Sequence, residues 1–285
     1  MENKSYLKTL KPKNELLKKV IAYFYFHVCE EENHSESFYF YPNYLHAVTI
    51  YIGNKVNLSY NPICSNIEKD ENRKSITCLY TVNSKHKTLV NINGSFHKIG
   101  IVFYPLGFNH FIKKTLNELM TKEFMKIDLG ESINEALKNI DKTDDLNVQL
   151  ETLENELLKL YQPFQEPILN DSIREIILSN GAIKISELEE QFQTNRKKLL
   201  RLFKKHTLIS MEDYKKMVMF RNSLNYALQN KEEANLTDVA LFAMYYDQSH
   251  FIKHFKSITN ETPKTLLPKI NKLGNEDLYW HFFEK

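Results

Sequence analysis

Hydrogen-bonding side chains are concentrated in one short segment near the end of the chain, residues 247–256. Phe251 and Phe255 in this segment are four residues apart, which places both rings on one face of a helix. The polar side chains between them then point away from that face. They are Asp247, Gln248, Ser249, His250, Lys253, His254 and Lys256. Gln and Ser donate and accept hydrogen bonds, His can do either, and Lys reaches guanine or phosphate, so the chemistry is recognition of base edges.

A second polar segment is strongly basic. Residues 196–221 contain nine basic side chains, opposed only by Glu212 and Asp213. The nine are Arg196, Lys197, Lys198, Arg201, Lys204, Lys205, Lys215, Lys216 and Arg221. Since the formal net charge of the whole chain is only +2, this local charge is a candidate electrostatic footprint for phosphate. The alternative is an ordinary lysine-rich surface helix.

Two similar pairs of helices are predicted to hold these segments, at 185–205 and 236–256. Each pair consists of a helix, a tight turn and a second helix with an apolar stripe, Leu199 with Phe203 in one and Phe251 with Phe255 in the other. A long helix at 211–230 separates the pairs. A repeated helix-turn-helix on a rigid connector suits the reading of two successive major-groove segments of DNA.

Local signals predict seven short helices after residue 168. Gly181 is a suitable helix stop, and Pro263 suits a first helical turn. Ser186 with Glu189 has the spacing of a capping box, and Ser210 with Asp213 has the same spacing. Thr194 or Asn195 is expected to cap the basic helix.

The second pair resembles the signature of the AraC/XylS-type transcription regulators. The positions that carry the resemblance are Val239, Ala240, Tyr245, Asp247–Ser249, Phe251, Phe255, Lys256, Thr262 and Pro263. The first pair agrees in register at Leu188, Leu199, Arg201–Phe203 and Phe220. The N-terminal stretches "YFYPNYLHAVTIYIG" and "IGIVFYPLGFNHF" resemble one effector-domain type of this family. The resemblance implies a bacterial-type, sequence-specific DNA-binding regulator with a sensory N-terminal domain.

The chain departs from the usual family pattern mainly at its turns. Met244 and Asn260 stand where the family usually has Gly, and Gln193 and Leu208 replace customary small or Gly residues. Met219 and Ser223 stand where Arg and Ala are common, and the basic residue usual after Thr-Pro is missing at "TLL". Base preference is therefore not carried over from the family.

The sequence pattern of the first half of the chain is typical of an α+β domain. Four β-branched and aromatic runs, at 36–53, 74–83, 87–94 and 97–108, and a fifth ending near Val28, predict a mostly antiparallel sheet or barrel-like domain with helices. Residues 163–170 contain two prolines and mark the boundary. We expect an effector or dimerisation domain at 1–163, a DNA-binding domain at 168–270 and a C-terminal tail at 271–285.

Three features of the first half leave two interpretations each. Leucines 146–160 fall at four-three spacing, which suits either the domain core or a homodimer contact. The aromatic residues around 23–50 and 103–108 form either a core or a cavity for a small-molecule effector. His46, His97 and His110 lie near strand ends and either line a pocket or serve ordinary core and surface roles.

Other classes of function find little support. The sequence has no Walker A loop, GxGxxG, HExxH or GxSxG stretch, so we expect no enzyme, catalytic residue or cofactor. His250 and His254 have a metal-binding spacing but no evident companion, so no metal is expected. Cys29, Cys64 and Cys78 fit reduced thiols in a cytoplasm. No apolar run is long enough for a membrane span.

We therefore expect a cytoplasmic transcription regulator with double-stranded DNA as its partner. The expected DNA contacts of the first pair are Asn195, Arg196, Lys197, Lys198, Arg201, Lys204 and Lys205. Those of the second pair are Asp247, Gln248, Ser249, His250, Lys253, His254 and Lys256. The rival is a ligand- or protein-binding module whose helix-turn-helix repeat has become an interaction surface.

Overall fold

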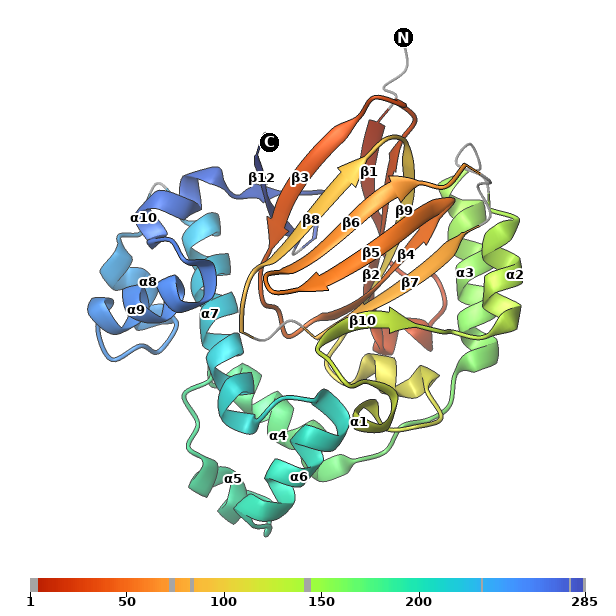
Figure 1. The fold of residues 1–285 in the computed structure, drawn as a ribbon. Helices are drawn as coiled ribbons and strands as arrows, with labels where there is room; N and C mark the ends of the chain where they lie inside the picture. Colours follow the sequence, from red (N-terminus) through yellow and green to blue (C-terminus); the bar gives the residue numbers. More distant parts are fainter. Residues whose placement is uncertain are drawn as a thin grey trace.

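The computed structural model describes residues 5–71, 75–82, 85–140, 145–231, 233–276 and 278–283. Two six-stranded sheets face each other (Figure 1), and the N-terminal half supplies all of their strands except two, which come from residues 271–283. In spatial order the first sheet contains β1 (Ser5–Leu10), β2 (Ile21–Cys29), β9 (Phe96–Phe103), β4 (His46–Ile52), β7 (Ile76–Thr81) and β10 (Phe124–Ile127). The second contains β11 (Asn271–Lys272), β12 (Tyr279–Phe283), β3 (Ser35–Phe40), β8 (Thr88–Asn93), β6 (Ile63–Lys69) and β5 (Asn54–Tyr60).

The central strands of the first sheet are buried along their whole length. Every residue of β2 and β9 is buried, which explains why their sequences, "IAYFYFHVC" and "FHKIGIVF", are almost continuously apolar. One face of this sheet meets the second sheet, with Tyr25 and Phe38 in the shared core. The predicted α+β domain is therefore confirmed, with two sheets in place of a closed barrel.

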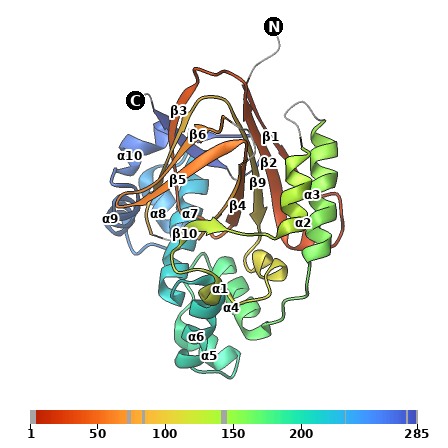
Figure 2. The same ribbon diagram turned by 45° about the vertical axis from the view of Figure 1, so that its right-hand side comes forward.

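Helices cover the other face of the first sheet, where α2 and α3 lie side by side (Figure 2). The helical elements of this half are η1 (Leu17–Lys19), η2 (Gly107–Phe111), α1 (Leu116–Leu119), α2 (Glu131–Lys138) and α3 (Leu146–Leu160). Leu150, Leu153 and Leu157 of α3 are each 1 % exposed and belong to the core of the same chain. The homodimer hypothesis for this leucine seam is therefore wrong, because its central leucines are already covered within the subunit.

The C-terminal half contains the seven predicted α-helices. They are α4 (Pro167–Leu178), α5 (Ile185–Gln191), α6 (Arg196–Thr207), α7 (Met211–Gln229), α8 (Leu236–Phe242), α9 (Gln248–Thr259) and α10 (Pro263–Leu266), followed by η3 (Leu267–Lys269). Asn195 caps α6 by accepting a hydrogen bond from the backbone N–H of Lys198 at 2.9 Å. Ser210 caps α7 as predicted, accepting from the backbone N–H of Asp213 at 3.1 Å.

The prediction that Ser186 caps α5 is wrong. The helix begins at Ile185, one residue before Ser186, and the Glu187 carboxylate accepts the backbone N–H of Lys184 at 3.0 Å. Glu189, expected as the partner of Ser186, instead accepts the backbone N–H of Arg196 across the turn to α6. The residues after 270, expected as a tail, form β11 and β12 at the edge of the second sheet.

Candidate functional site

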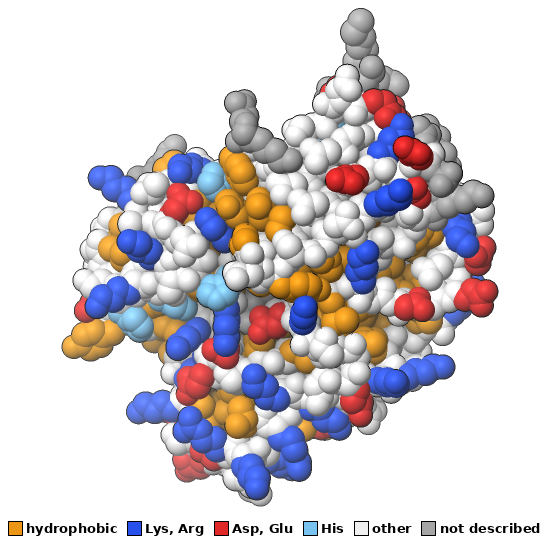
Figure 3. Space-filling view, viewed as in Figure 1, with side chains coloured by type: hydrophobic (Ala, Val, Ile, Leu, Met, Phe, Trp, Pro, Cys, Tyr) orange, Lys and Arg blue, Asp and Glu red, His pale blue; other side chains and the backbone are white. Residues whose placement is uncertain are grey.

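The basic helix α6 presents its charges outwards. Leu199, Leu202 and Phe203 are buried against the rest of the domain. All of its Lys and Arg side chains are exposed, namely Arg196, Lys197, Lys198, Arg201, Lys204 and Lys205. Figure 3 shows Lys and Arg side chains scattered over the lower part of the molecule, the region of α5 and α6. The outer face of α6 is thus free to meet a polyanion.

The outer face of α9 is polar and less charged. Phe251 and Phe255 have no exposed surface and contact each other edge to face with ring centroids 5.7 Å apart, as the stripe predicted. Exposed around them are Gln248, Ser249, His250, Lys253 and Lys256. The carboxylate of Asp247 is engaged at the start of α9, where it accepts the backbone N–H of His250 at 2.7 Å.

His254 lies against the turn of the second pair. Its Nδ1 is 2.7 Å from the hydroxyl oxygen of Tyr245, and its side chain is half-buried. Burial lowers the pKa of His254 to about 4, with Lys216 and His250 adding to the effect, so the ring is uncharged at neutral pH. Of the seven residues expected to contact DNA in this pair, three make internal contacts: Asp247 caps α9, Gln248 accepts the Thr237 hydroxyl at 3.1 Å, and His254 is bonded to Tyr245.

The turns of the two pairs have the same backbone geometry. Gln193 and Met244, between the two helices of each pair, have φ of 47° and 60°. Leu208 and Asn260, which end α6 and α9, have φ of 68° and 61°. These are the four turn positions at which the sequence lacks the expected Gly or small residue, and all four adopt the left-handed region that favours Gly. The two pairs are therefore repeats of one structural unit, with α7 between them.

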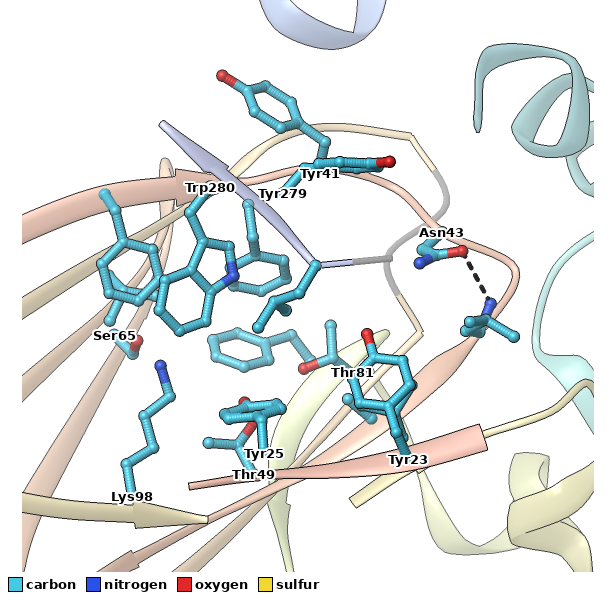
Figure 4. A pocket seen from close by; sticks show the side chains of 18 of the residues that line it. Tyr23, Tyr25, Tyr41, Asn43, Thr49, Ser65, Thr81, Lys98, Tyr279 and Trp280 are labelled. Carbon is cyan, nitrogen blue, oxygen red and sulfur yellow. Dashed lines mark hydrogen bonds between the residues drawn. The ribbon is translucent and has the colours of Figure 1, made fainter. Parts of the chain in front are cut away.

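A cavity of about 100 Å³ lies between the two sheets beside the C-terminal half (Figure 4). Its walls are mostly aromatic, and they combine residues of β2, β3, β4 and β9 with Arg221 of α7 and Tyr279 and Trp280 of β12. Gly100 of β9 makes room for the Tyr25 ring, because a Cβ at Gly100 would lie 1.8 Å from a ring carbon of Tyr25. Because Arg221, Tyr279 and Trp280 belong to the C-terminal half, the cavity is bordered by both halves of the chain.

Lys98 is one of two cations that line this cavity, the other being Arg221. It is only 2 % exposed, and its Nζ lies 4.0 Å from the ring centroid of Trp280 and 4.6 Å from that of Phe38. Burial lowers the pKa of Lys98 to about 7, and the nearby Glu36 carboxylate opposes the shift. The hydroxyl of Ser65, which also lines the cavity, is buried and has no hydrogen-bond partner among the described residues. Such a site offers an ammonium and a hydroxyl to a small ligand in apolar surroundings.

Residues 188–268 match the protein family described as a helix-turn-helix domain. The C-terminal part of the chain is an AraC-type helix-turn-helix domain. Domains of this type bind DNA in transcription regulators, so the match supports a DNA-binding domain in the C-terminal part of the chain.

The chain is also similar to solved structures of ToxT from Vibrio cholerae. One, at 1.65 Å resolution, has 10 % sequence identity and a TM-score of 0.47, covering 92 % of this chain and 97 % of that chain. ToxT with an unsaturated fatty acid bound has 13 % identity and a TM-score of 0.46, covering 97 % and 99 %. Likeness at this level does not decide what this regulator binds. No curated protein sequence matches the chain.

The aromatic segment 23–50, for which the sequence left a core and an effector cavity open, supplies Tyr23, Tyr25 and Phe38 to the cavity wall. The two cations of the wall escaped sequence reasoning, although signals for both exist. Lys98 is a charged residue inside an otherwise apolar buried strand. Arg221 was counted with the basic segment, but it is 2 % exposed and lies on the buried face of α7 with Met217, Phe220 and Leu224. Positions 217, 220, 221 and 224 recur at helical spacing and therefore share one face of α7. Because the other three residues on that face are apolar, Arg221 is expected to be a buried cation.

The histidines of the N-terminal half have internal roles. His46 Nδ1 is 2.9 Å from the Tyr80 hydroxyl, and His97 Nε2 is 3.2 Å from the Gln149 side-chain oxygen. His110 Nδ1 accepts the backbone N–H of Phe164 at 3.1 Å. None of the three lines the cavity, so the core interpretation of these residues is confirmed.

Among the described residues, Cys29, Glu31 and His34 offer one donor atom each within 4.8 Å of one another. Such groupings with exposed acidic side chains are common without an ion, so this cluster alone does not make a metal centre. In the described part of the chain, no helix combines the length and apolar character that a membrane crossing requires.

Proposed function

We propose that the regulator reads two successive major-groove segments of DNA with α6 and α9. The observation that carries this proposal is the repeated geometry: two capped helix pairs with left-handed turns at equivalent positions, each exposing the outer face of its second helix. The 19-residue helix α7 is about 28 Å long and spaces the pairs by nearly one turn of B-DNA.

The proposed roles of α6 and α9 differ because their exposed side chains differ. Arg196, Lys197, Lys198, Lys204 and Lys205 contact phosphates, and Arg201, near the middle of the exposed face of α6, contacts a guanine. On α9, Gln248, Ser249 and His250 read base edges near the helix start, while Lys253 and Lys256 reach phosphate or guanine. Asn195 and Asp247 hold the starts of the two helices, and His254 supports the second turn through Tyr245.

A salt titration with random-sequence duplex DNA tests the proposal. If the protein neutralises four to six phosphates, the logarithm of its binding constant falls with log salt concentration at a slope of roughly −4 to −5. The rival function, an interaction module for a ligand or protein, predicts no such binding at any salt concentration. A slope near zero, or no binding in low salt, would therefore favour the rival.

We further propose that the cavity binds a small apolar effector with an anionic group. Lys98 and Ser65 supply the polar partners, and the aromatic walls supply the apolar contact. The cavity, at about 100 Å³, is smaller than the apolar cavity of ~150 Å³ that takes up benzene, so the effector has a short chain and its binding must move the walls. A six-carbon carboxylate is a suitable probe, and the emission of Trp280, the single tryptophan of the chain, reports binding.

The charge of Lys98 makes this binding depend on pH. The amine titrates at about pH 7 in the free protein, and a bound carboxylate raises that pKa. Hexanoate remains ionised from pH 6 to pH 9. Its affinity is therefore highest below pH 7 and falls by up to about tenfold for each unit above pH 7. Titration of Trp280 emission with hexanoate at pH 6, 7, 8 and 9 measures this dependence.

Two controls isolate the charge. 1-Hexanol has a similar chain without an acid group and should bind with no pH dependence, and Lys98→Met should remove the pH dependence for hexanoate. Equal pH profiles for hexanoate and 1-hexanol in the wild-type protein would contradict the role of Lys98. With DNA as the partner, the proposed site of action is the cytoplasm. A homodimer through a surface other than the leucine seam stays a prediction.

A further inference from the structure

The C-terminal strand β12 lies between the cavity and the second helix pair. It leaves the DNA-binding domain after η3 and pairs antiparallel with β3, where Trp280 is opposite Phe40 and Phe282 is opposite Phe38. Figure 1 shows its position between the sheets and the helical region of α7 and α10. A segment that follows the DNA-binding domain in sequence thus completes the wall of the proposed effector site.

Successive residues of β12 point to opposite faces of the strand and contact different parts of the molecule. Trp280 faces the cavity, where its ring stacks on Phe38 with centroids 4.2 Å apart and lies 4.0 Å from Lys98 Nζ. Tyr279 also borders the cavity, and its ring meets α7, where the guanidinium carbon of Arg221 lies 4.7 Å from the ring centroid. Both side chains are 3 % exposed.

The Tyr279 side of the strand is continuous with the core of the second helix pair. Tyr279 belongs to one buried cluster with Phe220 and Leu224 of α7 and with Phe251 and Phe255 of α9. Phe220 and Phe255 are in direct contact, with ring centroids 5.5 Å apart. A movement of Tyr279 therefore meets the same side chains that hold α9 in place.

β12 is held less firmly than the strands inside the sheet. It has β3 on one side and only the two-residue β11 on the other. Its preceding turn is tied to the first sheet by an ion pair between Lys11 and Glu276 at 2.7 Å and by a hydrogen bond from the backbone N–H of Asn275 to Thr9 at 3.3 Å. Because these described contacts lie at the surface, the start of β12 is anchored less firmly than an inner strand, while Tyr279 and Trp280 are held by the core.

We propose that β12 is the coupling element of the regulator, with Trp280 detecting occupancy of the cavity and Tyr279 passing the change to α7 and α9 through Arg221. The inference rests on the proposed function, because it assumes that the cavity takes an effector. An acid group that pairs with Lys98 Nζ must share the space that the Trp280 ring now occupies at contact distance. The ring and its strand then shift relative to Arg221, and the position of α9 shifts with them.

The test compares DNA affinity with and without hexanoate in the full-length chain. The DNA is a duplex selected by the wild-type protein from a random-sequence pool. In the wild type, saturating hexanoate should change the Kd for this duplex by at least about fivefold, the lower range of measured allosteric coupling. Because Tyr279 also lines the cavity, Tyr279→Ala is compared with the wild type at hexanoate concentrations that saturate each protein, as Trp280 emission shows. The variant should still bind DNA, but its Kd should change by less than twofold when hexanoate is added.

Two further variants keep the result interpretable. Phe283→Ala, on the same strand but outside the cavity lining, is the matched control and should keep the wild-type response. If Tyr279→Ala fails to fold, Arg221→Met removes the partner of Tyr279 with little change in volume and should abolish the response in the same way. A wild-type response that survives in Tyr279→Ala or in Arg221→Met overturns the role of β12 and leaves the proposed function intact.

A wild-type protein that fails to bind DNA or hexanoate, or whose DNA affinity ignores hexanoate, contradicts the proposed function itself. The two failures are therefore distinguishable. Linkage gives a second reading of the same coupling, because DNA must change the affinity for hexanoate by the same factor.

Discussion

The two helix pairs share a backbone plan but differ in surface chemistry and in attachment. α6 exposes six basic side chains, whereas the exposed face of α9 combines two lysines with Gln248, Ser249 and His250. The first pair shares its core with the N-terminal helices, and the side-chain amide of Asn109 donates to the backbone carbonyl of His206 at 3.2 Å. The second pair is attached through Tyr41 and Tyr279, next to the cavity. We therefore expect α6 to supply most of the electrostatic affinity for DNA, and α9 to change position when the effector binds.

The largest expected effect is on stability, and it distinguishes the core around Phe203 from the core around Phe251. Phe203→Ala and Phe251→Ala each remove a fully buried ring and should each cost about 3–5 kcal/mol of unfolding free energy. Because Phe203 belongs to the core shared with the N-terminal half, its loss should lower the stability of the whole chain. Phe251→Ala should mainly increase hydrogen exchange in α8 and α9, as measured by mass spectrometry.

The expected difference between the two cores would be contradicted if Phe251→Ala kept its full thermal stability and lost only DNA binding. That result would place the Phe251 ring in the groove. Equal increases of hydrogen exchange over both pairs in both variants would show that the two cores are not independent.

The next-largest expected effect is on the DNA affinity that residues of α6 supply. Arg201→Ala should weaken binding to the selected duplex by about 1–3 kcal/mol and relax base preference at one position, as expected for a guanine contact. Lys204→Ala is the matched control on the same exposed face. It should reduce the salt slope by about one unit with little change in base preference. Filter or fluorescence binding at three salt concentrations measures both, and wild-type behaviour of both variants would exclude α6 from the groove.

The smallest effect tests the shared turn geometry. Met244 is 52 % exposed and has φ of 60°, so replacing it with Gly relieves left-handed backbone strain with little loss of burial. We expect Met244→Gly to raise the unfolding free energy by about 1 kcal/mol, and Gln193→Gly, at the equivalent exposed position, to do the same. Thermal denaturation measures the change. A loss of stability in either variant would show that the side chain, not the backbone, determines that turn.

The sequence predicted the DNA-binding half well because its signals are local. Caps, turn residues and apolar stripes lie within a few residues of the structure they specify, and the four atypical turn residues marked the four left-handed turns. The N-terminal half was predicted only in outline. The strands β1, β5, β6 and β10 are short and partly exposed, so their sequences lack a strong apolar pattern.

The candidate site was predicted unevenly for the same reason. Outer-face residues of α6 and α9 follow from helical period, with His254 as the exception because its bond to Tyr245 crosses a turn. A cavity was one of two interpretations of the aromatic residues around 23–50, but its full lining could not be predicted, because it forms where residues far apart in sequence meet. The pairing of Trp280 with Phe40 spans most of the chain, and nothing in "YWHFF" indicates its partner strand.

Hydroxyl-radical footprinting on a selected duplex tests the central claim most directly. If α6 and α9 read successive major-groove segments, the wild-type protein should protect two segments with centres about 10 base pairs apart on one face of the duplex. Arg201→Ala should weaken protection of one segment, and Gln248→Ala should weaken the other. A single protected segment, or two segments that both respond to the same substitution, would contradict a reading by two helices.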